Sequence, residues 1–143
     1  MTLHLQKLCV GAHTVDDLDA WVRLRVARNK KLGRGAVHDH VTRMFPKRRE
    51  DLLDGGSLYW VIKGVILVRQ RIIDLVEATG QDGVRRCEIL LEPPLIPVTP
   101  QPRRAFQGWR YLPSADAPAD LSAGADDDAP PALRAELAEL GLL

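Results

Sequence analysis

The sequence predicts an α+β fold: a small curved, mostly antiparallel sheet or small barrel with two flanking helices, followed by a disordered acidic tail. Three observations predict it. Two stretches combine helical spacing with helix end signals, several short stretches alternate or are rich in β-branched residues, and the chain after residue 113 has the composition of a tail. With 143 residues, 45% of them hydrophobic and 27% charged, the chain is long enough to bury one core.

The first two expected elements are a strand and a long helix. Residues 3–10 alternate in the manner of a strand. Thr14 is a suitable N-cap, and Asp17 follows three positions later, as in a capping box. Apolar residues at helical spacing then predict a helix from Thr14 to about residue 27, ended by Gly33.

The next stretch predicts two strands around a short helix. Residues 37–44 are expected to form the first of these strands. Pro46 is able to occupy the first turn of a helix that runs to Leu53 and ends at two glycines. Residues 58–63 (LYWVIK) are aromatic and β-branched, which predicts the following strand.

Residues 65–76 fit either a strand or one face of a helix. We favour a strand, because a turn over residues 79–83 leads into residues 84–92, which alternate well. Two such runs joined by a glycine-containing turn predict a hairpin.

The last part of the body is interrupted by prolines. Five prolines within residues 93–102 predict an extended loop or edge strand, because proline cannot donate to a central ladder. Residues 106–112 predict a final strand, so the domain spans 1–113. The tail, 114–143, is expected to be disordered, with a possible short helix from Pro131.

Charge is distributed unevenly between body and tail. Residues 1–113 hold 19 Lys and Arg against 12 Asp and Glu, whereas residues 114–143 hold 1 Arg against 7 acids. This asymmetry indicates that the tail folds over the basic body or that the body meets an anionic partner. A solubilising tail without contacts is the alternative.

Several classes of protein are not indicated. The two cysteines lack the spacing of a disulfide framework, and there is neither a signal peptide nor an apolar run of membrane-spanning length. We therefore expect a soluble cytoplasmic protein without membrane contact. No GxSxG motif or phosphate loop is present, so no catalytic residue and no cofactor is assigned, although distant residues can converge to form an enzyme site.

His38 and His40 are the only pair with metal-ligand character. In a strand, residues two apart point the same way, so the two imidazoles are able to share an ion. A zinc site needs three or four ligands, and no further pair stands at ligand spacing. We favour packing or surface histidines and assign no metal.

Basic residues interleaved with aromatic ones form the richest functional pattern. Guanidinium groups bind phosphates while aromatic rings stack on unpaired bases, so this mixture suits single-stranded nucleic acid. The alternative is that the rings belong to the core and that the arginines are scattered over an ordinary basic surface. The candidate binding residues are Arg43, Lys47, Arg48, Arg49, Tyr59, Lys63, Arg69, Arg71, Arg103, Arg104, Trp109 and Arg110.

Four runs carry a resemblance to a known family: residues 40–48 (HVTRMFPKR), 52–64 (LLDGGSLYWVIKG), 69–72 (RQRI) and 102–112 (PRRAFQGWRYL). Residues 3 to about 113 resemble the alphaproteobacterial family called domain of unknown function 1489, and the tail is expected to lie outside it. This family implies no activity and no site residue. The order of elements is also similar to PUA-like barrels of the ASCH and EVE groups, which implies a small barrel that binds RNA or modified bases. The ASCH pattern GxKxxExR is missing, because Lys63 and Gly64 are followed by VILVR.

The leading hypothesis is a non-catalytic module that binds RNA or modified nucleic acid. The first alternative is a protein-interaction or adaptor module, in which the acidic tail and its leucine stripe recruit a protein partner. The second is an enzyme that acts on a nucleotide-like anionic small molecule, with His40 and a carboxylate converging in a cleft.

Overall fold

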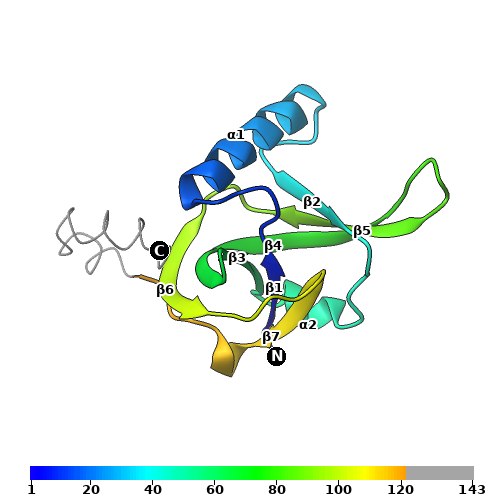
Figure 1. Cartoon of the computed structure of the whole chain (residues 1–143). Helices are drawn as coiled ribbons and strands as arrows, with labels where there is room; N and C mark the ends of the chain where they lie inside the picture. The colour runs from blue at the N-terminus through cyan, green and yellow to red at the C-terminus, as the bar shows by residue number, and fades with distance from the viewer. Residues whose placement is uncertain (122–143) are drawn as a thin grey trace.

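A seven-stranded sheet forms the body of the molecule in the computed structural model, which describes residues 1–121 (Figure 1). The strands lie in the order β2-β5-β4-β3-β1-β7, and β6 pairs with β4 beside this path. Their bounds are β1 Leu3–Leu8, β2 His38–Thr42, β3 Ser57–Ile62, β4 Val65–Thr79, β5 Arg85–Leu91, β6 Ile96–Pro102 and β7 Trp109–Pro113. The α+β class and the mostly antiparallel sheet are confirmed, since only the β1–β3 pair is parallel.

The 15-residue strand β4 organises the sheet. Its first half pairs with both β3 and β6, and its second half pairs with β5. The pairing register shifts between β4 and each of these partners, and such irregularities bend a strand. The sheet is therefore strongly curved, but β2 and β7 stand at its two ends and do not pair, so the described part of the chain does not close into a barrel.

Helix α1 (Val15–Lys31) covers one face of the sheet, as Figure 1 shows. Its N-terminus has the predicted cap: the Asp17 backbone N–H donates to the Thr14 hydroxyl at 3.0 Å. The Asp17 carboxylate in turn accepts from the His13 N–H. The helix runs four residues beyond the predicted end, because Arg28, Lys30 and Lys31 suit the negative end of the helix dipole.

Helix α2 spans Arg49–Leu53 and begins three residues later than predicted. Pro46 is buried but lies before the helix rather than in its first turn. The Arg48 N–H donates to the Tyr111 hydroxyl at 3.1 Å instead of entering an earlier helical turn. Residues 93–102 were predicted to form an extended loop or edge strand, and β6 lies within this stretch as an edge strand against β4.

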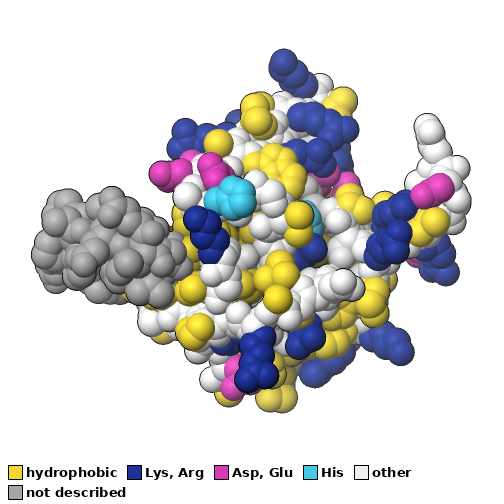
Figure 2. Space-filling view, in the orientation of Figure 1, with side chains coloured by type: hydrophobic (Ala, Val, Ile, Leu, Met, Phe, Trp, Pro, Cys, Tyr) yellow, Lys and Arg dark blue, Asp and Glu magenta, His cyan; other side chains and the backbone are white. Residues whose placement is uncertain are grey.

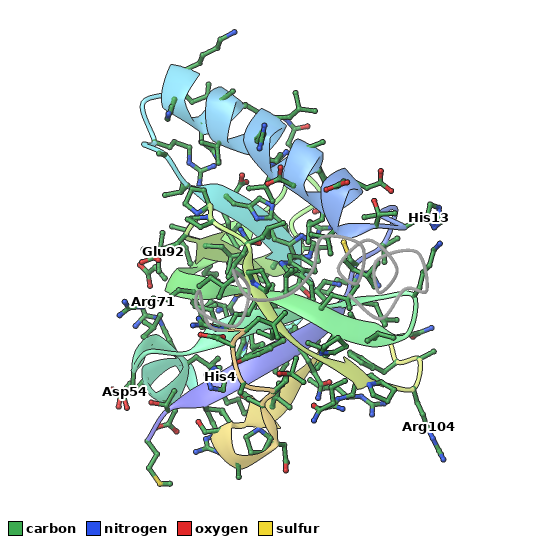
Figure 3. The ribbon with its side chains drawn as sticks, turned by 90° about the vertical axis from the view of Figure 1, so that its left-hand side faces the viewer. His4, His13, Asp54, Arg71, Glu92 and Arg104 are labelled. Atoms are coloured by element: carbon green, nitrogen blue, oxygen red, sulfur yellow. The ribbon has the colours of Figure 1, made fainter. Side chains whose placement is uncertain are left out.

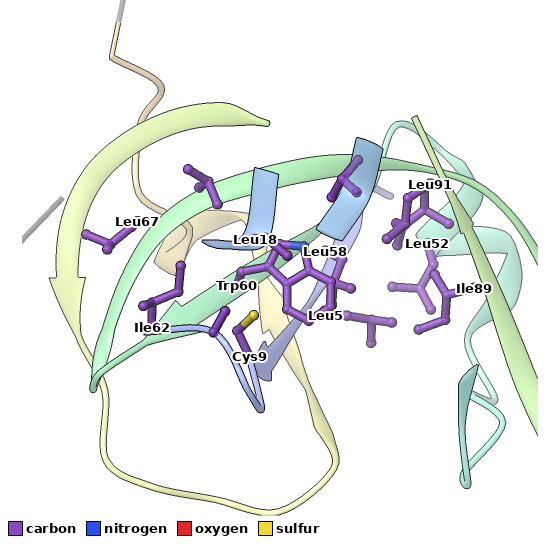
Figure 4. Packing of buried hydrophobic residues seen from close by; sticks show 14 of the residues in the cluster. Leu5, Cys9, Leu18, Leu52, Leu58, Trp60, Ile62, Leu67, Ile89 and Leu91 are labelled. Carbon is purple, nitrogen blue, oxygen red and sulfur yellow. The ribbon is translucent and has the colours of Figure 1, made fainter. Parts of the chain in front are cut away.

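Both faces of β3 are buried, and this fixes where functional side chains are able to lie. Leu58, Trp60 and Ile62 join the larger core beneath α1, where they pack with residues such as Leu18 (Figure 4). Tyr59 and Val61 point to the opposite face and join a smaller cluster. The sheet therefore has an α1 face and an opposite face, each with its own apolar core.

The predicted disorder after residue 113 is wrong for residues 114–121. Ser114–Asp116 form a 3₁₀ turn, and the backbone of Asp120 forms an isolated antiparallel β-bridge with Val98 of β6. The Thr99 N–H donates to the Ala119 carbonyl and the Leu121 N–H to the Pro97 carbonyl. The acidic run at 126–128 and the predicted terminal helix lie outside the described residues. Within residues 1–121, no helix is long and apolar enough to span a membrane.

Candidate nucleic-acid interface

The twelve predicted binding residues do not converge on one surface. Alternation along β7 directs Trp109 and Tyr111 toward the α1 face, and Arg110 toward the opposite face. In Figure 3, Arg71 and Arg104 project from opposite sides of the molecule. Figure 2 shows Lys and Arg side chains spread over separate elements of the visible face. The twelve candidate residues therefore do not form one shared surface.

Three of the predicted arginines are neutralised by carboxylates. Arg48 pairs with Asp51 at 2.8 Å and Arg49 with Asp74 at 2.5 Å. The third, Arg69, pairs with Asp120 at 2.7 Å. An arginine held by a carboxylate has to exchange one anion for another before it binds a phosphate, so these residues do not form a ready-made surface.

The two predicted stacking residues serve the fold. Tyr59 is only 4% exposed, and its ring meets His4 edge-on with 5.1 Å between centroids. Trp109 is partly buried, contacts Tyr111 edge-on at 4.9 Å and donates its indole N–H to the Met44 carbonyl at 2.8 Å. Trp109 thus holds the loop between β2 and α2, and Tyr59 offers no exposed ring face to a base.

Arg103 has a different environment, because neutral groups alone hold its guanidinium. Its Nε donates to the side-chain oxygen of Gln6 at 3.1 Å, and one terminal nitrogen donates to the Pro102 carbonyl at 2.9 Å. The other terminal nitrogen donates to the Gln101 side chain. No carboxylate of residues 1–121 forms an ion pair with Arg103, so neutral groups fix its orientation, and Asp116 is the acidic residue that lines the same groove.

Other cations lie beside Arg103 on the face opposite α1. Gln6 pairs with Arg110 across β1 and β7, so it lies between the two arginines. The Arg110 guanidinium stands 5.0 Å from the centre of the Phe106 ring, a cation–π contact. Lys63 occupies the turn between β3 and β4, where the neighbouring Gly64 carbonyl accepts from the Arg103 N–H at 2.8 Å.

We call this surface the Arg103 face. It comprises Gln6, Gln101, Arg103 and Arg110, which the contacts above connect, together with Lys63 and Arg104, the chain neighbours of Gly64 and Arg103. Its four cations have no ion-pair partner within the described part of the chain. Beside Arg103 the surface is hollowed into a groove of about 580 Å³. The groove is lined by Gln6, Gln101, Arg103, Tyr111, Leu112, Pro113, Ala115, Asp116 and Ala117.

Arg43 takes part in a second, smaller hollow of about 410 Å³ between the loop after β2 and the β4–β5 hairpin. Phe45 lines it with Glu77, Arg85 and Arg86. The Arg85 guanidinium donates to Glu77 at 2.5 Å, and Arg86 pairs with Asp82 at 2.8 Å. Arg43 is therefore the only cation of this hollow without an ion pair among residues 1–121.

Sequence reasoning missed Gln6, Gln101 and Phe45. The quoted run 40–48 contains Phe45, so its position between two basic residues was an available signal. The two glutamines carry no local signal, because their role depends on an arginine that approaches them through folding.

The predicted histidine pair lies against the core. Nδ1 of His38 and the Trp60 indole N–H both contact Oε1 of Gln70, at 3.0 and 2.8 Å. The His40 ring meets Trp60 edge-on at 5.1 Å, and within residues 1–121 its buried Nε2 has no hydrogen-bond partner. Burial, helped by the charge of nearby Lys7, lowers the pKa of His40 to about 4.

Asp39 lies between these histidines in sequence but points to the other side of β2. Its carboxylate accepts from Arg25 at 2.6 and 3.2 Å and from Asn29 at 2.8 Å. Burial alone raises its pKa, but hydrogen bonds from Asn29 and Arg25 outweigh this effect and lower the pKa to about 2. Within residues 1–121, no three His, Cys, Asp or Glu side chains gather in a way that would hold a metal ion.

The model of the family described as "Protein of unknown function (DUF1489)" matches residues 5–143. The chain belongs to this family. The match runs to residue 143, so the expectation that the resemblance stops before the tail is wrong. No curated protein and no solved structure matches the chain.

Proposed function

We propose that this DUF1489 protein binds RNA or single-stranded DNA through phosphate contacts on its Arg103 face. The observation that carries the proposal is the environment of Arg103, whose guanidinium is fixed by three neutral acceptors beside a groove. A fixed cation without a counter-charge is suited to receive an anion, and a guanidinium binds phosphate oxygens in a bidentate manner.

Three further cations surround this position. Lys63 comes from the β3–β4 turn, Arg104 from the β6–β7 connection and Arg110 from β7 itself. A phosphate chain follows such an extended set of cations better than a single small anion does, because each phosphate meets its own positive side chain. The proposed contacts are made mainly to the backbone, since the described residues offer no exposed ring on this face: Phe106 is 8% exposed and lies under Arg110.

The experiment is fluorescence anisotropy of the full chain with a labelled single-stranded RNA of about 16 nucleotides. Three or four phosphate contacts predict that affinity falls about 20- to 50-fold between about 50 and 200 mM salt. The same measurement with single-stranded DNA and with duplex RNA determines which class of nucleic acid is preferred.

Arg103→Gln and Arg43→Gln form a matched pair of variants. Each removes one guanidinium that has no ion pair within residues 1–121, but Arg43 lies at the second hollow rather than on the Arg103 face. We expect Arg103→Gln to weaken binding about five- to tenfold and Arg43→Gln to leave it within twofold, as for one charge-assisted phosphate contact. Binding that is absent, independent of salt or lost only in Arg43→Gln refutes the proposal.

The two alternative functions receive less support. The adaptor hypothesis depends on residues 122–143, which lie outside the described residues. The enzyme hypothesis requires a carboxylate that converges with His40, whereas the neighbouring Asp39 points to the opposite side of β2 and pairs with α1.

A further inference from the structure

We propose that Arg69 is a second phosphate position on the face opposite α1, and that Asp120 fills it and competes with nucleic acid. The inference rests on the proposed function, because it concerns the same face and the same ligand. It assigns a regulatory role to the start of the acidic tail, which the structure describes as far as residue 121.

Arg69 has the geometry of an anion site. Its side chain is 21% exposed, and one terminal nitrogen donates to the Ser57 hydroxyl at 2.8 Å, which fixes the guanidinium plane. Nε and the other terminal nitrogen each donate at 2.7 Å to one oxygen of the Asp120 carboxylate. Arginine binds two phosphate oxygens in this same forked arrangement, so the carboxylate occupies the place that a phosphate would take.

A single cross-strand row connects this position with the Arg103 face. Arg69 of β4 pairs with Tyr59 of β3, Tyr59 pairs with Gln6 of β1, and Gln6 pairs with Arg110 of β7. Directly paired residues point to the same face of a sheet. Three strand spacings separate the backbones of Arg69 and Arg110 by about 14 Å. A nucleic-acid strand that crosses this row would therefore meet an arginine at each end.

The segment 114–121 runs along the same row. Asp116 lines the groove beside Arg103, and Asp120 binds Arg69. Two carboxylates four residues apart thus lie near the two cationic positions, in the way that two phosphates of a bound strand would. This part of the tail is therefore an internal anion, and it covers the row from Arg69 to Arg110 along which we propose that the nucleic acid binds.

The Arg69–Asp120 ion pair is able to open because its carboxylate is exposed to solvent, whereas the segment before it is anchored by the Ser114 hydroxyl, which donates to the Thr2 carbonyl at 2.7 Å, and by Ala117, which packs against the smaller core. Two backbone hydrogen bonds to β6, from Thr99 to Ala119 and from Leu121 to Pro97, fix the end of the segment. Asp120 is 43% exposed, and an ion pair of this exposure is of small value in water. A polyanion that contacts several cations at once is therefore a sufficient competitor.

Asp120→Asn tests the inference in the full chain, with the same labelled single-stranded RNA. The substitution removes the counter-charge but keeps the size of the side chain, so Arg69 becomes available. We expect affinity to rise about fivefold at low salt, and the salt dependence to steepen by about 0.7 in log–log slope, the value of one additional phosphate contact. Asp82→Asn is the matched control, because it releases Arg86 on the β4–β5 hairpin.

Arg69→Gln combined with Asp120→Asn is expected to remove the gain, because no guanidinium is left to take the phosphate. Circular dichroism confirms that each variant is folded. Equal binding by the wild type and Asp120→Asn, or an equal gain in Asp82→Asn, overturns the inference while the proposed function stands. If neither the wild type nor any variant binds RNA at low salt, both proposals are wrong.

Discussion

The Nε of Arg103 donates a hydrogen bond of 3.1 Å to the side-chain oxygen of Gln6, across 97 residues of sequence. The strand that supplies Gln6 also pairs with β7, so the same amide stands next to Arg110. A neutral acceptor in this place directs the guanidinium without cancelling its charge. The functional proposal depends on this combination of fixed direction and free charge.

Gln6→Glu changes the acceptor to a carboxylate with almost no change of shape. The fold should be kept, because glutamate retains the oxygen that accepts from Arg103 and gives up only the long 3.5 Å hydrogen bond from the Gln6 amide to the Tyr111 carbonyl. Its charge should pair with the guanidinium, so we expect RNA affinity to fall about fivefold and the log–log salt slope to decrease by about 0.7. Anisotropy titrations at several salt concentrations measure both quantities.

Gln81→Glu adds the same charge in the exposed hairpin turn and is the control. Equal losses in the two variants would indicate a general effect of net charge rather than a role of Arg103.

Trp109→Phe separates a structural role of this ring from a stacking role. The variant loses the 2.8 Å hydrogen bond to the Met44 carbonyl, and we expect the free energy of unfolding to fall by about 1 kcal/mol. RNA affinity should stay within twofold, because the ring lies on the α1 face and not on the Arg103 face. Urea denaturation and anisotropy measure the two effects. A large loss of RNA affinity in a folded variant would restore Trp109 as a stacking residue.

Asp39 is expected to stabilise the fold at neutral pH. Its pKa is lowered from 3.8 to about 2 in the folded chain, so the stabilisation is complete above pH 3.8 and is lost as pH falls toward 2. Asp39→Asn should therefore lower the free energy of unfolding by about 2 kcal/mol at pH 7, through the loss of its charge-assisted bonds to Arg25 and Asn29. Urea denaturation at pH 7 and pH 3 should show the difference between wild type and variant becoming smaller at the lower pH. A difference that does not change with pH contradicts this assignment.

His40 is expected to act in the opposite direction. Its pKa is lowered from 6.5 to about 4, so the unfolded chain binds more protons between these values, and stability falls as pH decreases through that window. His40→Leu removes this penalty and the buried Nε2 that has no partner. The wild type should therefore lose about 2 kcal/mol more stability than the variant between pH 7 and pH 4.

His13→Gln, on the exposed loop before α1, is the control and should behave like the wild type. Equal pH dependence in the wild type and His40→Leu would show that His40 does not titrate as its burial requires.

The sequence predicted most strands because local patterns decide them. Cys87, Ile89 and Leu91 alternate along β5 and are fully buried, as their spacing indicated. Thr14 caps α1 because its hydroxyl needs only a backbone N–H three residues away. The start of α2 was misplaced, since a hydroxyl on β7 takes the N–H of Arg48, and local sequence does not contain that contact.

The candidate site was less predictable because charge compensation is a long-range property. Arg49 and Asp74 are 25 residues apart, and Arg69 and Asp120 are 51 residues apart, so no local pattern shows that these arginines are paired. Arg103 looked equivalent to them in the sequence. Only the approach of Gln6 and Gln101 distinguishes it.

Chemical-shift mapping tests the central claim most directly. Backbone amide spectra of the uniformly ¹⁵N-labelled full chain are recorded while a single-stranded RNA of about 16 nucleotides is added at low salt. We expect the largest shifts on the face opposite α1, at Gln6, Lys63, Arg103, Arg104 and Arg110, with a reversal as salt is raised. Shifts confined to the loop after β2 and the β4–β5 hairpin, or no shifts at all, would contradict the claim that the Arg103 face binds nucleic acid.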